Sequence, residues 1–477
     1  MRYVSTRGQV VPIEFTDAVL MGLADDGGLL LPESIPQVAA RLDDWQGLSY
    51  KELAFEVLSL YVGDISPEDL KGLIDRSYGE AFDPEVAPTV PVGDLHVLEL
   101  WHGPTMSFKD VALQLLGNLF EHILAGRGGR LNILGATSGD TGSAAIYGVR
   151  GRKGIDIFIM HPKGKVSRIQ ERQMTTVLDA NVHNIAVSGS FDDCQRIMKS
   201  LAGDLDFKRE CSLGAVNSVN WARVLAQIVY YFYATLALQD ATGSDKIRVC
   251  VPTGNFGNIL AGWYAMQMGA PISKLILATN ENDILSRFFR TGVYSLGQVH
   301  QTLAPAMDIQ VASNFERYLY YMVGCDGARL RELMTHFSQT GSLQIEVVPG
   351  GCVDQTIEAG AATTKDVLAA IRRCYEENGY VIDPHTACGL AVAQSLVPAA
   401  IVGEGSSGRS EPLLCLATAH PAKFPDAITK ATGKEIVGHP SIDELSSMPT
   451  RCEVLPNDVE AVRTFMTDVI AKRGGKC

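Results

Sequence analysis

Short apolar runs alternate with longer segments of helical periodicity from about residue 95 onward. Short runs bounded by turn residues indicate buried strands, whereas apolar positions three and four residues apart indicate helices. Strands are predicted at 95–101, 131–134, 155–160, 182–187, 247–251, 275–278 and 413–417. Helices are predicted at 111–124, 141–149, 192–201, 219–238, 259–268, 365–377 and 387–396. This alternation predicts an α/β fold with a mostly parallel sheet, in which ligands bind at the C-terminal ends of the strands.

Residues 1–94 have the pattern of a separate, mainly helical N-terminal unit. Ser49 and Glu52 have the spacing of a capping box at the start of a helix over 49–62. Ser66 and Pro67 begin the next helix as its N-cap and first helical residue. Neither helix carries an obvious chemical group, so we expect this unit to have a packing role.

Composition and charge narrow the class of protein. The 477 residues suffice for two or three domains, and the net charge of -13 argues against non-specific binding to nucleic acid or an anionic membrane. No apolar run approaches the roughly 18 residues of a membrane span, and the N-terminus lacks the apolar core of a signal peptide. The ten cysteines and ten histidines show no metal-binding spacing, so we expect reduced thiols and no metal site. The sequence therefore predicts a soluble, cytoplasmic protein.

Lys109 stands at the entrance of the predicted helix over 111–124, directly after the turn that begins at His102. The helix is apolar nearly all round, which indicates that it is buried. Burial lowers the pKa of a lysine, and a lysine that can lose its proton is a nucleophile for aldehydes. The alternative is a surface Lys109 that pairs with Asp110, and the residues alone leave both interpretations open.

Two glycine-rich turns connect predicted strands to predicted helices, GNFGN at 254–258 and GATSGDTG at 135–142. Backbone N–H groups converge at such a turn, and the dipole of the following helix favours negative charge. Each turn is therefore a candidate anion site. The first lacks both the Lys-Ser/Thr of a P-loop and the spacing of a dinucleotide fingerprint, so an ordinary glycine-rich connection is its alternative.

Several motifs carry a resemblance to a known family: YVSTRG at 3–8, HGPTMSFKDVALQ at 102–114, GATSGDTGSAA at 135–145, VPTGNFGNILAG at 251–262 and ATAHPAKF at 417–424. In this order they resemble threonine synthases, which belong to the tryptophan-synthase-like (fold type II) pyridoxal-phosphate enzymes. The resemblance covers essentially the whole chain. It implies two parallel-sheet α/β subdomains within 95–477, the smaller at about 130–215, and an insertion at about 281–350.

The resemblance implies pyridoxal 5'-phosphate as the cofactor. Lys109 would hold it as a Schiff base and then act as the acid and base of the reaction. The loop at 254–258 would bind its phosphate, and a threonine hydroxyl would meet its pyridine nitrogen. The cofactor-binding residues implied are Lys109, Gly254, Asn255, Phe256, Gly257, Asn258 and Thr418.

The second glycine-rich turn would bind the α-carboxylate of the substrate, and Asp140 within it would lie beside the phenolic oxygen of the cofactor. A carboxylate beside a phenolate is repulsive unless a proton or a cation lies between them. The long helix over 219–238 opens with Asn217 and Arg223, which we expect to help bind a substrate phosphate because arginine suits bidentate phosphate binding. Further positive charge comes from the basic segment at 163–172, although a solvated basic face is the alternative. The substrate-binding residues implied are Thr137, Ser138, Asp140, Thr141, Asn217 and Arg223.

The implied reaction converts O-phospho-L-homoserine and water into L-threonine and phosphate, by elimination of the γ-phosphate and addition of water at Cβ. The alternatives are another pyridoxal-phosphate lyase and a catalytically silent binding protein of the same fold. We expect a monomer or a homodimer with no nucleic-acid or membrane partner.

Overall fold

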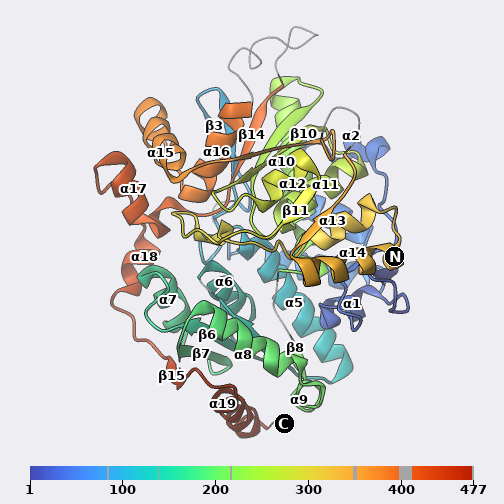
Figure 1. Cartoon of the computed structure of the whole chain (residues 1–477), viewed down its shortest axis with the longest axis vertical. Coiled ribbons are helices and arrows are strands. Elements are labelled where there is room, and N and C mark those ends of the chain that lie inside the picture. The colour runs from blue at the N-terminus through green and yellow to red at the C-terminus, as the bar shows by residue number, and fades with distance from the viewer. Residues whose placement is uncertain (83–84, 138, 215–217, 348–351, 397–410, 475–477) are drawn as a thin grey trace.

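The computed structural model describes residues 1–82, 85–137, 139–214, 218–347, 352–396 and 411–474. Two sheets with mostly parallel strands lie one above the other in the view of Figure 1, each covered by helices. The α/β fold predicted from the sequence is therefore confirmed. Within the described residues, no helix is long and apolar enough to cross a membrane.

The larger sheet holds six strands, and its C-terminal edge gathers several of the motifs. The strand order is β13 (Ile357–Ala361), β10 (Ile272–Thr279), β9 (Ile247–Pro252), β14 (Leu413–Ala417), β4 (Leu95–Glu99) and β3 (Thr89–Val92). All neighbours are parallel except β3 and β4. Because parallel strands end at the same edge, the segments that follow β4, β9 and β14 lie side by side there.

The smaller sheet holds five parallel strands. Their order is β15 (Glu453–Pro456), β7 (Val182–Ser188), β6 (Ile155–Pro162), β5 (Leu131–Ala136) and β8 (Leu213–Gly214). Every residue of β6 is buried, as expected for a parallel strand covered on both faces. Cys211, next to β8 in this core, is disulfide-bonded, so the expectation that all thiols are reduced is wrong for this residue.

Helix α5 (Lys109–Arg127) is the long helix that joins the two sheets. It packs against α6 (Asp140–Val149) of the smaller unit and against α10 (Trp221–Thr242) of the larger one. A side chain at Gly117 of α5 would overlap the carbonyl oxygen of Gly148 in α6, so these two helices approach at backbone distance. Helix α16 (Pro384–Leu396) packs against β9, β10, β13 and β14, while α11 (Gly257–Met268) packs against α10. Burial of α5 follows from its position between these layers.

The N-terminal residues pack on this central helical layer. Their elements are β1 (Tyr3–Ser5), α1 (Phe15–Met21), β2 (Leu30–Pro32), η1 (Ala39–Arg41), α2 (Leu42–Trp45), α3 (Tyr50–Ser59) and α4 (Pro67–Ser77). The predicted capping box is present, because the Ser49 side chain accepts from the Glu52 N–H while the Glu52 carboxylate accepts from the Ser49 N–H. Helix α3 packs against α10, and α4 packs against α5.

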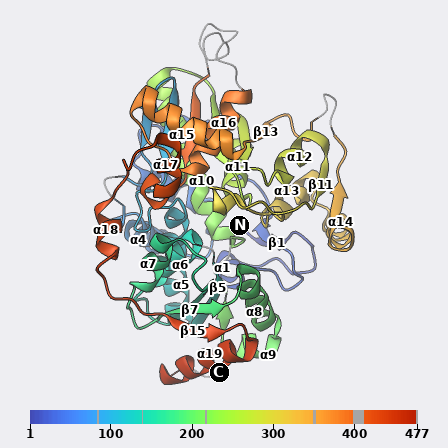
Figure 2. The same cartoon turned by 60° about the vertical axis from the view of Figure 1, so that its left-hand side comes forward.

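Residues 281–347 are more regular than the sequence indicated. They form α12 (Ile284–Thr291), β11 (Val293–Ser295), η2 (Pro305–Met307), α13 (Phe315–Met322), α14 (Gly327–Thr340) and β12 (Ser342–Gln344). Figure 2 shows α12, α13 and α14 gathered on one side of the molecule. The aromatic residues that obscured the periodicity pack together, with Phe315 against Phe288 and Tyr294. These residues belong to the main hydrophobic core, which Phe315 joins through its contact with Phe256.

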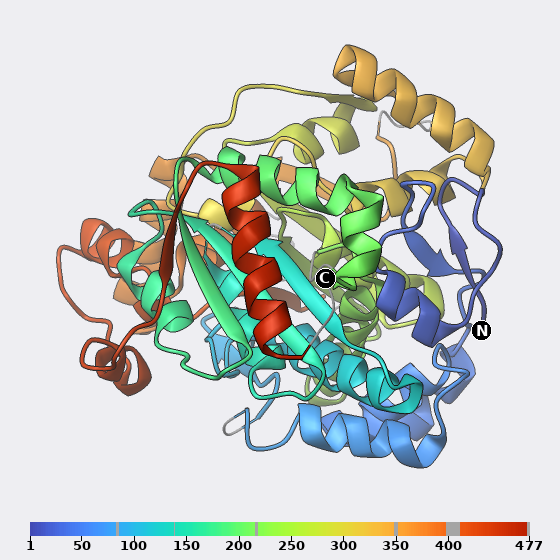
Figure 3. The same cartoon turned by 90° about the horizontal axis from the view of Figure 1, so that it is seen from below.

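The C-terminal chain crosses from the larger unit to the smaller one. It runs through α15 (Thr364–Asn378), η3 (Pro421–Lys423), α17 (Pro425–Thr432) and α18 (Pro440–Leu445) to β15 and α19 (Val459–Lys472). The smaller unit also contains α7 (Arg168–Thr175), α8 (Phe191–Gly203) and α9 (Leu205–Glu210). Figure 3 shows α19 lying beside α8 across the strands of the smaller sheet. The sequence did not predict β13, β15 or α19.

Candidate active site

Lys109 is fixed by the crossing of two segments at the edge of the larger sheet. Ser107 forms an antiparallel bridge with Ala419, and the Phe108 N–H donates to the Thr418 carbonyl at 2.9 Å. Thr418 follows β14 and Lys109 begins α5, so the backbone pairing places the two residues next to each other. Both were predicted site residues.

The turn before Lys109 is closed by Asp110, the second residue of α5. The Thr105 N–H donates to Asp110 Oδ2 at 2.8 Å, and the Thr105 hydroxyl donates to Oδ1 at 2.7 Å. Gly103 leaves no room for a side chain, because a Cβ there would overlap Asp110. Burial raises the pKa of Asp110 to about 6, although the hydrogen bonds from Thr105 oppose that rise. Since Asp110 is buried and bound to Thr105, Lys109 and Asp110 do not form the surface pair that was the alternative.

Lys109 itself is half-buried, and its surroundings favour the neutral amine. Burial lowers the pKa of Lys109 from its ordinary value of 10.5 to about 8. The negative charge of Asp140 opposes this fall, while the positive charges of Lys423 and Arg223 add to it. About one tenth of the lysine is therefore free base at pH 7, far more than at its ordinary pKa.

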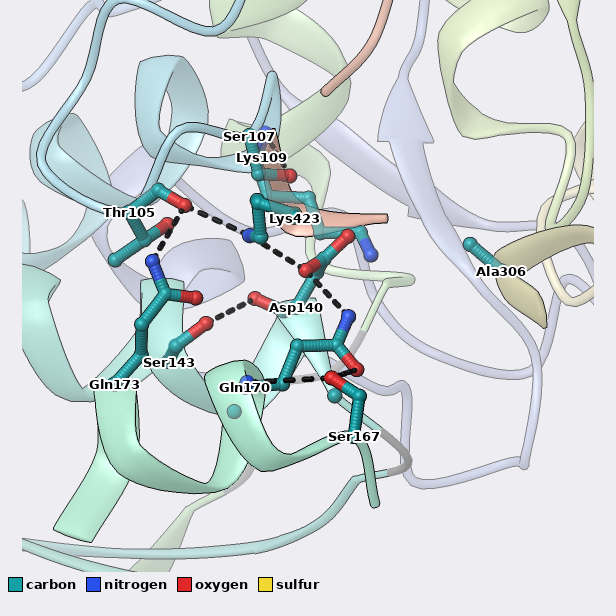
Figure 4. Close-up of polar contacts among 12 residues, drawn as sticks. Thr105, Ser107, Lys109, Asp140, Ser143, Ser167, Gln170, Gln173, Ala306 and Lys423 are labelled. Atoms are coloured by element: carbon teal, nitrogen blue, oxygen red, sulfur yellow. Dashed lines mark hydrogen bonds and ion pairs between the residues drawn. The ribbon is translucent and has the colours of Figure 1, made fainter. Parts of the chain in front are cut away.

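Asp140 lies at the start of α6 and is held by a cation that the sequence reasoning did not assign. Lys423 Nζ lies 2.6 Å from Asp140 Oδ1, and Gln170 Nε2 donates to the same oxygen at 2.8 Å (Figure 4). Burial alone would raise the pKa of Asp140, but the charges of Lys423 and Lys109 and these hydrogen bonds hold it well below its usual range. Asp140 is therefore an ionised carboxylate whose charge is balanced by Lys423.

The glycine-rich turn at 135–142 uses one of its predicted hydroxyls for its own structure. Thr137 Oγ1 accepts from the N–H groups of Gly139 and Gly142, both at 3.0 Å. Thr141, in the first turn of α6, is partly exposed. Ser138 lies outside the described residues. The turn thus presents Thr141 and the N-terminus of α6, while Thr137 acts through the shape of the loop.

The second glycine-rich turn leads from β9 into α11. Phe256 adopts a left-handed backbone with φ 65°. A Cβ at Gly254 would overlap the carbonyl oxygen of Ala306, and one at Gly257 would lie 3.2 Å from Asn314 Nδ2. The Asn255 carbonyl accepts from the Asn314 N–H at 3.1 Å. Ala306 and Asn314, both within residues 281–347, therefore pack against this loop and fix its shape.

Asn258 turns its side-chain oxygen away from the loop. Asn258 Oδ1 accepts from the hydroxyls of Tyr230 at 2.6 Å and Tyr231 at 2.9 Å, both on α10. Its Nδ2 is buried and has no hydrogen-bond partner among the described residues. Both N–H groups of this amide nitrogen are therefore candidates to bind a ligand.

Arg223 brings a buried cation to the surroundings of Lys109. It is only 5% exposed, and burial lowers its pKa to about 10. Nε and Nη1 of Arg223 have no hydrogen-bond partner within the described part of the chain. Buried donors of a charged group without partners are costly, so Arg223 is a candidate to bind an anion. Asn217, its predicted companion, lies outside the described residues.

The basic segment at 163–172 was expected to add positive charge near Arg223, but its basic side chains are not buried beside it. Lys163, Lys165 and Arg168 are exposed. Arg172 donates to the backbone carbonyls of Leu445 and Met448 and so anchors the C-terminal crossing. The solvated-face alternative therefore describes the exposed residues better, whereas Arg223 is buried.

These groups fit pyridoxal phosphate, whose aldehyde needs a neutral amine and whose phosphate needs N–H donors. Lys109 supplies the amine, and the loop before α11 supplies converging N–H groups at a helix N-terminus. A side chain at Gly254 would overlap Ala306, so the loop keeps its shape only with glycine at this position. No group of described histidine, cysteine or acidic side chains could hold a metal ion.

Comparison with known proteins defines the class. Residues 87–353 match the family described as Pyridoxal-phosphate dependent enzyme, so the protein is a pyridoxal-phosphate-dependent enzyme. Residues 2–78 match Threonine synthase N terminus, and residues 386–466 match Threonine synthase, C-terminal. The chain belongs to the threonine synthase family.

Individual relatives agree with this assignment over the full length. The chain is 45% identical over 471 residues to a threonine synthase of Pseudomonas aeruginosa, covering 98% of each chain. The crystal structure of a PLP-bound threonine synthase from Brucella melitensis superposes with a TM-score of 0.92 at 44% identity, covering 98% of this chain and 99% of that one. The yeast threonine synthase structure gives 0.91 at 40% identity, covering 99% of each. The fold implied by the resemblance, fold type II, is confirmed.

Proposed function

We propose that this enzyme converts O-phospho-L-homoserine and water into L-threonine and phosphate, with Lys109 as the lysine that carries pyridoxal 5'-phosphate. The observation that carries the proposal is a lysine of lowered pKa close to a buried arginine, two of whose donor nitrogens have no partner among the described residues. Burial lowers the pKa of Lys109 to about 8, and Arg223 lies near enough for its charge to add to that shift. Such a site offers a nucleophilic amine to an aldehyde and a cation to a phosphate.

When bound, pyridoxal phosphate supplies an electron sink that stabilises negative charge at the substrate Cα. Lys109 would take the proton from Cα and return it at the end of the reaction. A group with a pKa near the working pH transfers protons efficiently in both directions, and a pKa of about 8 meets this requirement. The crossing of 107–108 with 418–419 would hold the amine in place while it does so.

The remaining cofactor contacts follow from the loop geometry. Backbone N–H groups at the start of α11 would bind the cofactor phosphate, and Thr418 would meet the pyridine nitrogen. The unpartnered Asn258 Nδ2 is a further donor, although Tyr230 and Tyr231 occupy its oxygen. The proposed cofactor-binding set is Lys109, Gly254, Asn255, Phe256, Gly257, Asn258 and Thr418.

On the substrate side, Arg223 would bind the γ-phosphate together with Asn217. The N-terminus of α6 would receive the α-carboxylate, since helix N-termini favour anions. Nε and Nη1 of Arg223, which have no partner among the described residues, would donate to the phosphate oxygens. The proposed substrate-binding set is Thr137, Ser138, Asp140, Thr141, Asn217 and Arg223.

We also propose an organisation for the whole chain. Residues 1–94 would form the N-terminal domain and 95–477 the catalytic region, with a smaller subdomain at about 130–215 and an insertion at about 281–350. The return of β15 and α19 to the smaller sheet adds the C-terminus to that subdomain. A cytoplasmic location and a monomeric or homodimeric state complete the proposal.

A substrate comparison tests the proposed reaction. The purified holoenzyme should release threonine and phosphate in equal amounts from O-phospho-L-homoserine and should give almost no threonine from unphosphorylated homoserine. Deamination of serine or threonine, without threonine formation from the phosphorylated substrate, would place the enzyme among other pyridoxal-phosphate lyases instead.

A further inference from the structure

The site contains a second buried lysine, Lys423, which joins the two sheets. Its side chain is 0% exposed and that of Asp140 is 5% exposed. Lys423 belongs to η3, which follows β14 of the larger sheet, whereas Asp140 begins α6 behind the smaller sheet. Figure 4 shows the Lys423 side chain lying between Thr105 and Asp140. The ion pair therefore crosses the boundary between the two halves of the catalytic region.

The position of Lys423 is fixed from both sides. Its Nζ donates to the Thr105 carbonyl at 2.7 Å, and Thr105 in turn holds Asp110 at the start of α5. On the other side Asp140 is tied by Gln170, whose own carbonyl oxygen accepts from Ser167 at 3.1 Å. These contacts form a continuous chain from the Lys109 helix to α7. The geometry leaves Lys423 little freedom to serve as a mobile acid or base.

The charges that face Lys109 come from several elements and act in opposite directions. Asp140 on α6 and Asp110 on α5 favour its protonated form, whereas Lys423 on η3 and Arg223 on α10 favour its neutral form. Without Lys423, Asp140 would lose its ion-pair partner, and its negative charge would favour the protonated form of Lys109 more strongly. An opposite charge at close range favours the ammonium, which cannot attack an aldehyde.

We propose that Lys423 is a positioning residue for Lys109, because its ion pair with Asp140 keeps that carboxylate from holding the Lys109 amine in its protonated form. This inference rests on the proposed role of Lys109 as the cofactor lysine. Lys423 does not contact the reacting atoms in this account. It acts through Asp140.

The test measures how fast the apoenzyme forms an imine with pyridoxal, the cofactor aldehyde without its phosphate, as a function of pH. Lys423→Met should raise the apparent pKa of the reacting amine by about one unit or more, so imine formation at pH 7 should slow about tenfold or more. Asp140→Asn should lower that pKa and speed the reaction below pH 8. The double variant, which removes both charges, should return close to the wild-type pH profile.

Two matched variants separate charge from hydrogen bonding. Lys423→Arg keeps the cation and should preserve the pH profile. Gln170→Leu removes the other hydrogen bond to the same Asp140 oxygen without changing any charge, and it should shift the profile far less than Lys423→Met. If Lys423→Met proves unstable, Asp140→Asn should still shift the profile to lower pH, and the double variant should shift it back to the wild-type position.

A pH profile that stays at the wild-type position in both Lys423→Met and Asp140→Asn, or a double variant that stays at the shifted position of Asp140→Asn, would reduce the pair to a structural link and overturn the inference. Lys109→Ala serves as the background for every measurement. Undiminished imine formation in Lys109→Ala would instead refute the assignment of Lys109, which is part of the proposed function. The two failures are therefore distinguishable.

Discussion

Replacing Arg223 by methionine should strengthen the fold while it weakens the enzyme. Arg223 is buried, its pKa is lowered to about 10, and two of its donor nitrogens have no partner among the described residues. Since the folded state disfavours the charged form, folding carries a cost at every pH below about 10, and that cost fades only as the pH rises from about 10 to the ordinary pKa of arginine. The lowered pKa of Arg223 corresponds to a folding cost of about 3 kcal/mol. Methionine keeps much of the side-chain volume and removes the charge, so the free energy of unfolding should rise by up to that amount.

The same substitution should remove the proposed contact with the substrate phosphate. A hydrogen bond to a charged group contributes about 1.5–3 kcal/mol, which corresponds to a roughly ten- to hundredfold loss in kcat/KM for O-phospho-L-homoserine. The cofactor absorbance should stay unchanged, because Arg223 is assigned to the substrate side. Inorganic phosphate should raise the Tm of the wild-type protein more than that of the variant.

Arg317 provides a matched control. Burial also lowers its pKa to about 10, but its guanidinium donates to the Leu30 and Val219 carbonyls and to Asn314 Oδ1. Arg317→Met would leave these buried acceptors unsatisfied, at about 1–3 kcal/mol each, so this variant should be less stable than wild type. Thermal and urea unfolding of both variants give the comparison. An Arg223→Met protein that loses stability and keeps its kcat/KM would refute the reasoning.

Two further predictions concern the cofactor. Gly254→Val should weaken pyridoxal-phosphate affinity severely and Gly257→Val more mildly, because only the side chain at 254 would overlap a backbone oxygen. If equilibrium binding gives the same affinity for both variants and the wild type, this loop is not part of the site. Reconstitution of the apoenzyme with pyridoxal phosphate should accelerate as the pH rises through about 8, since the free base of Lys109 reacts; stopped-flow absorbance that shows a midpoint near 10.5 would indicate an exposed lysine instead.

Much of the fold could be predicted because local pattern and tertiary structure agree. The helix after Lys109 was predicted at 111–124 and spans Lys109–Arg127, and the strand predicted at 413–417 is β14. The elements that were missed depend on distant partners. Strand β15 pairs with β7, which lies more than 250 residues earlier in the chain, and short polar-flanked strands such as Glu453–Pro456 carry almost no periodicity.

Site residues could be predicted from the sequence where they lie in glycine-rich turns. They could not be predicted where their positions depend on contacts with residues distant in the chain. Lys423 and Thr105 are 318 residues apart, and neither flanking sequence indicates that Lys423 is buried beside Asp140. The sequence did contain a signal, because a carboxylate at position 140 required a nearby cation. The direction of the Asn258 side chain toward Tyr230 and Tyr231 likewise follows from the packing of α10 on α11.

The most direct test of the account locates the cofactor on the chain. Holoenzyme reduced with borohydride and digested should carry the pyridoxyl group on the peptide that contains Lys109, and the Lys109→Ala variant should carry no such label. Lys423 lies close enough to Lys109 for its charge to affect it, so the experiment must distinguish these two lysines as carriers of the cofactor. A pyridoxyl group on Lys423, or on any other lysine in the wild-type enzyme, would contradict the assignment on which the proposed chemistry rests.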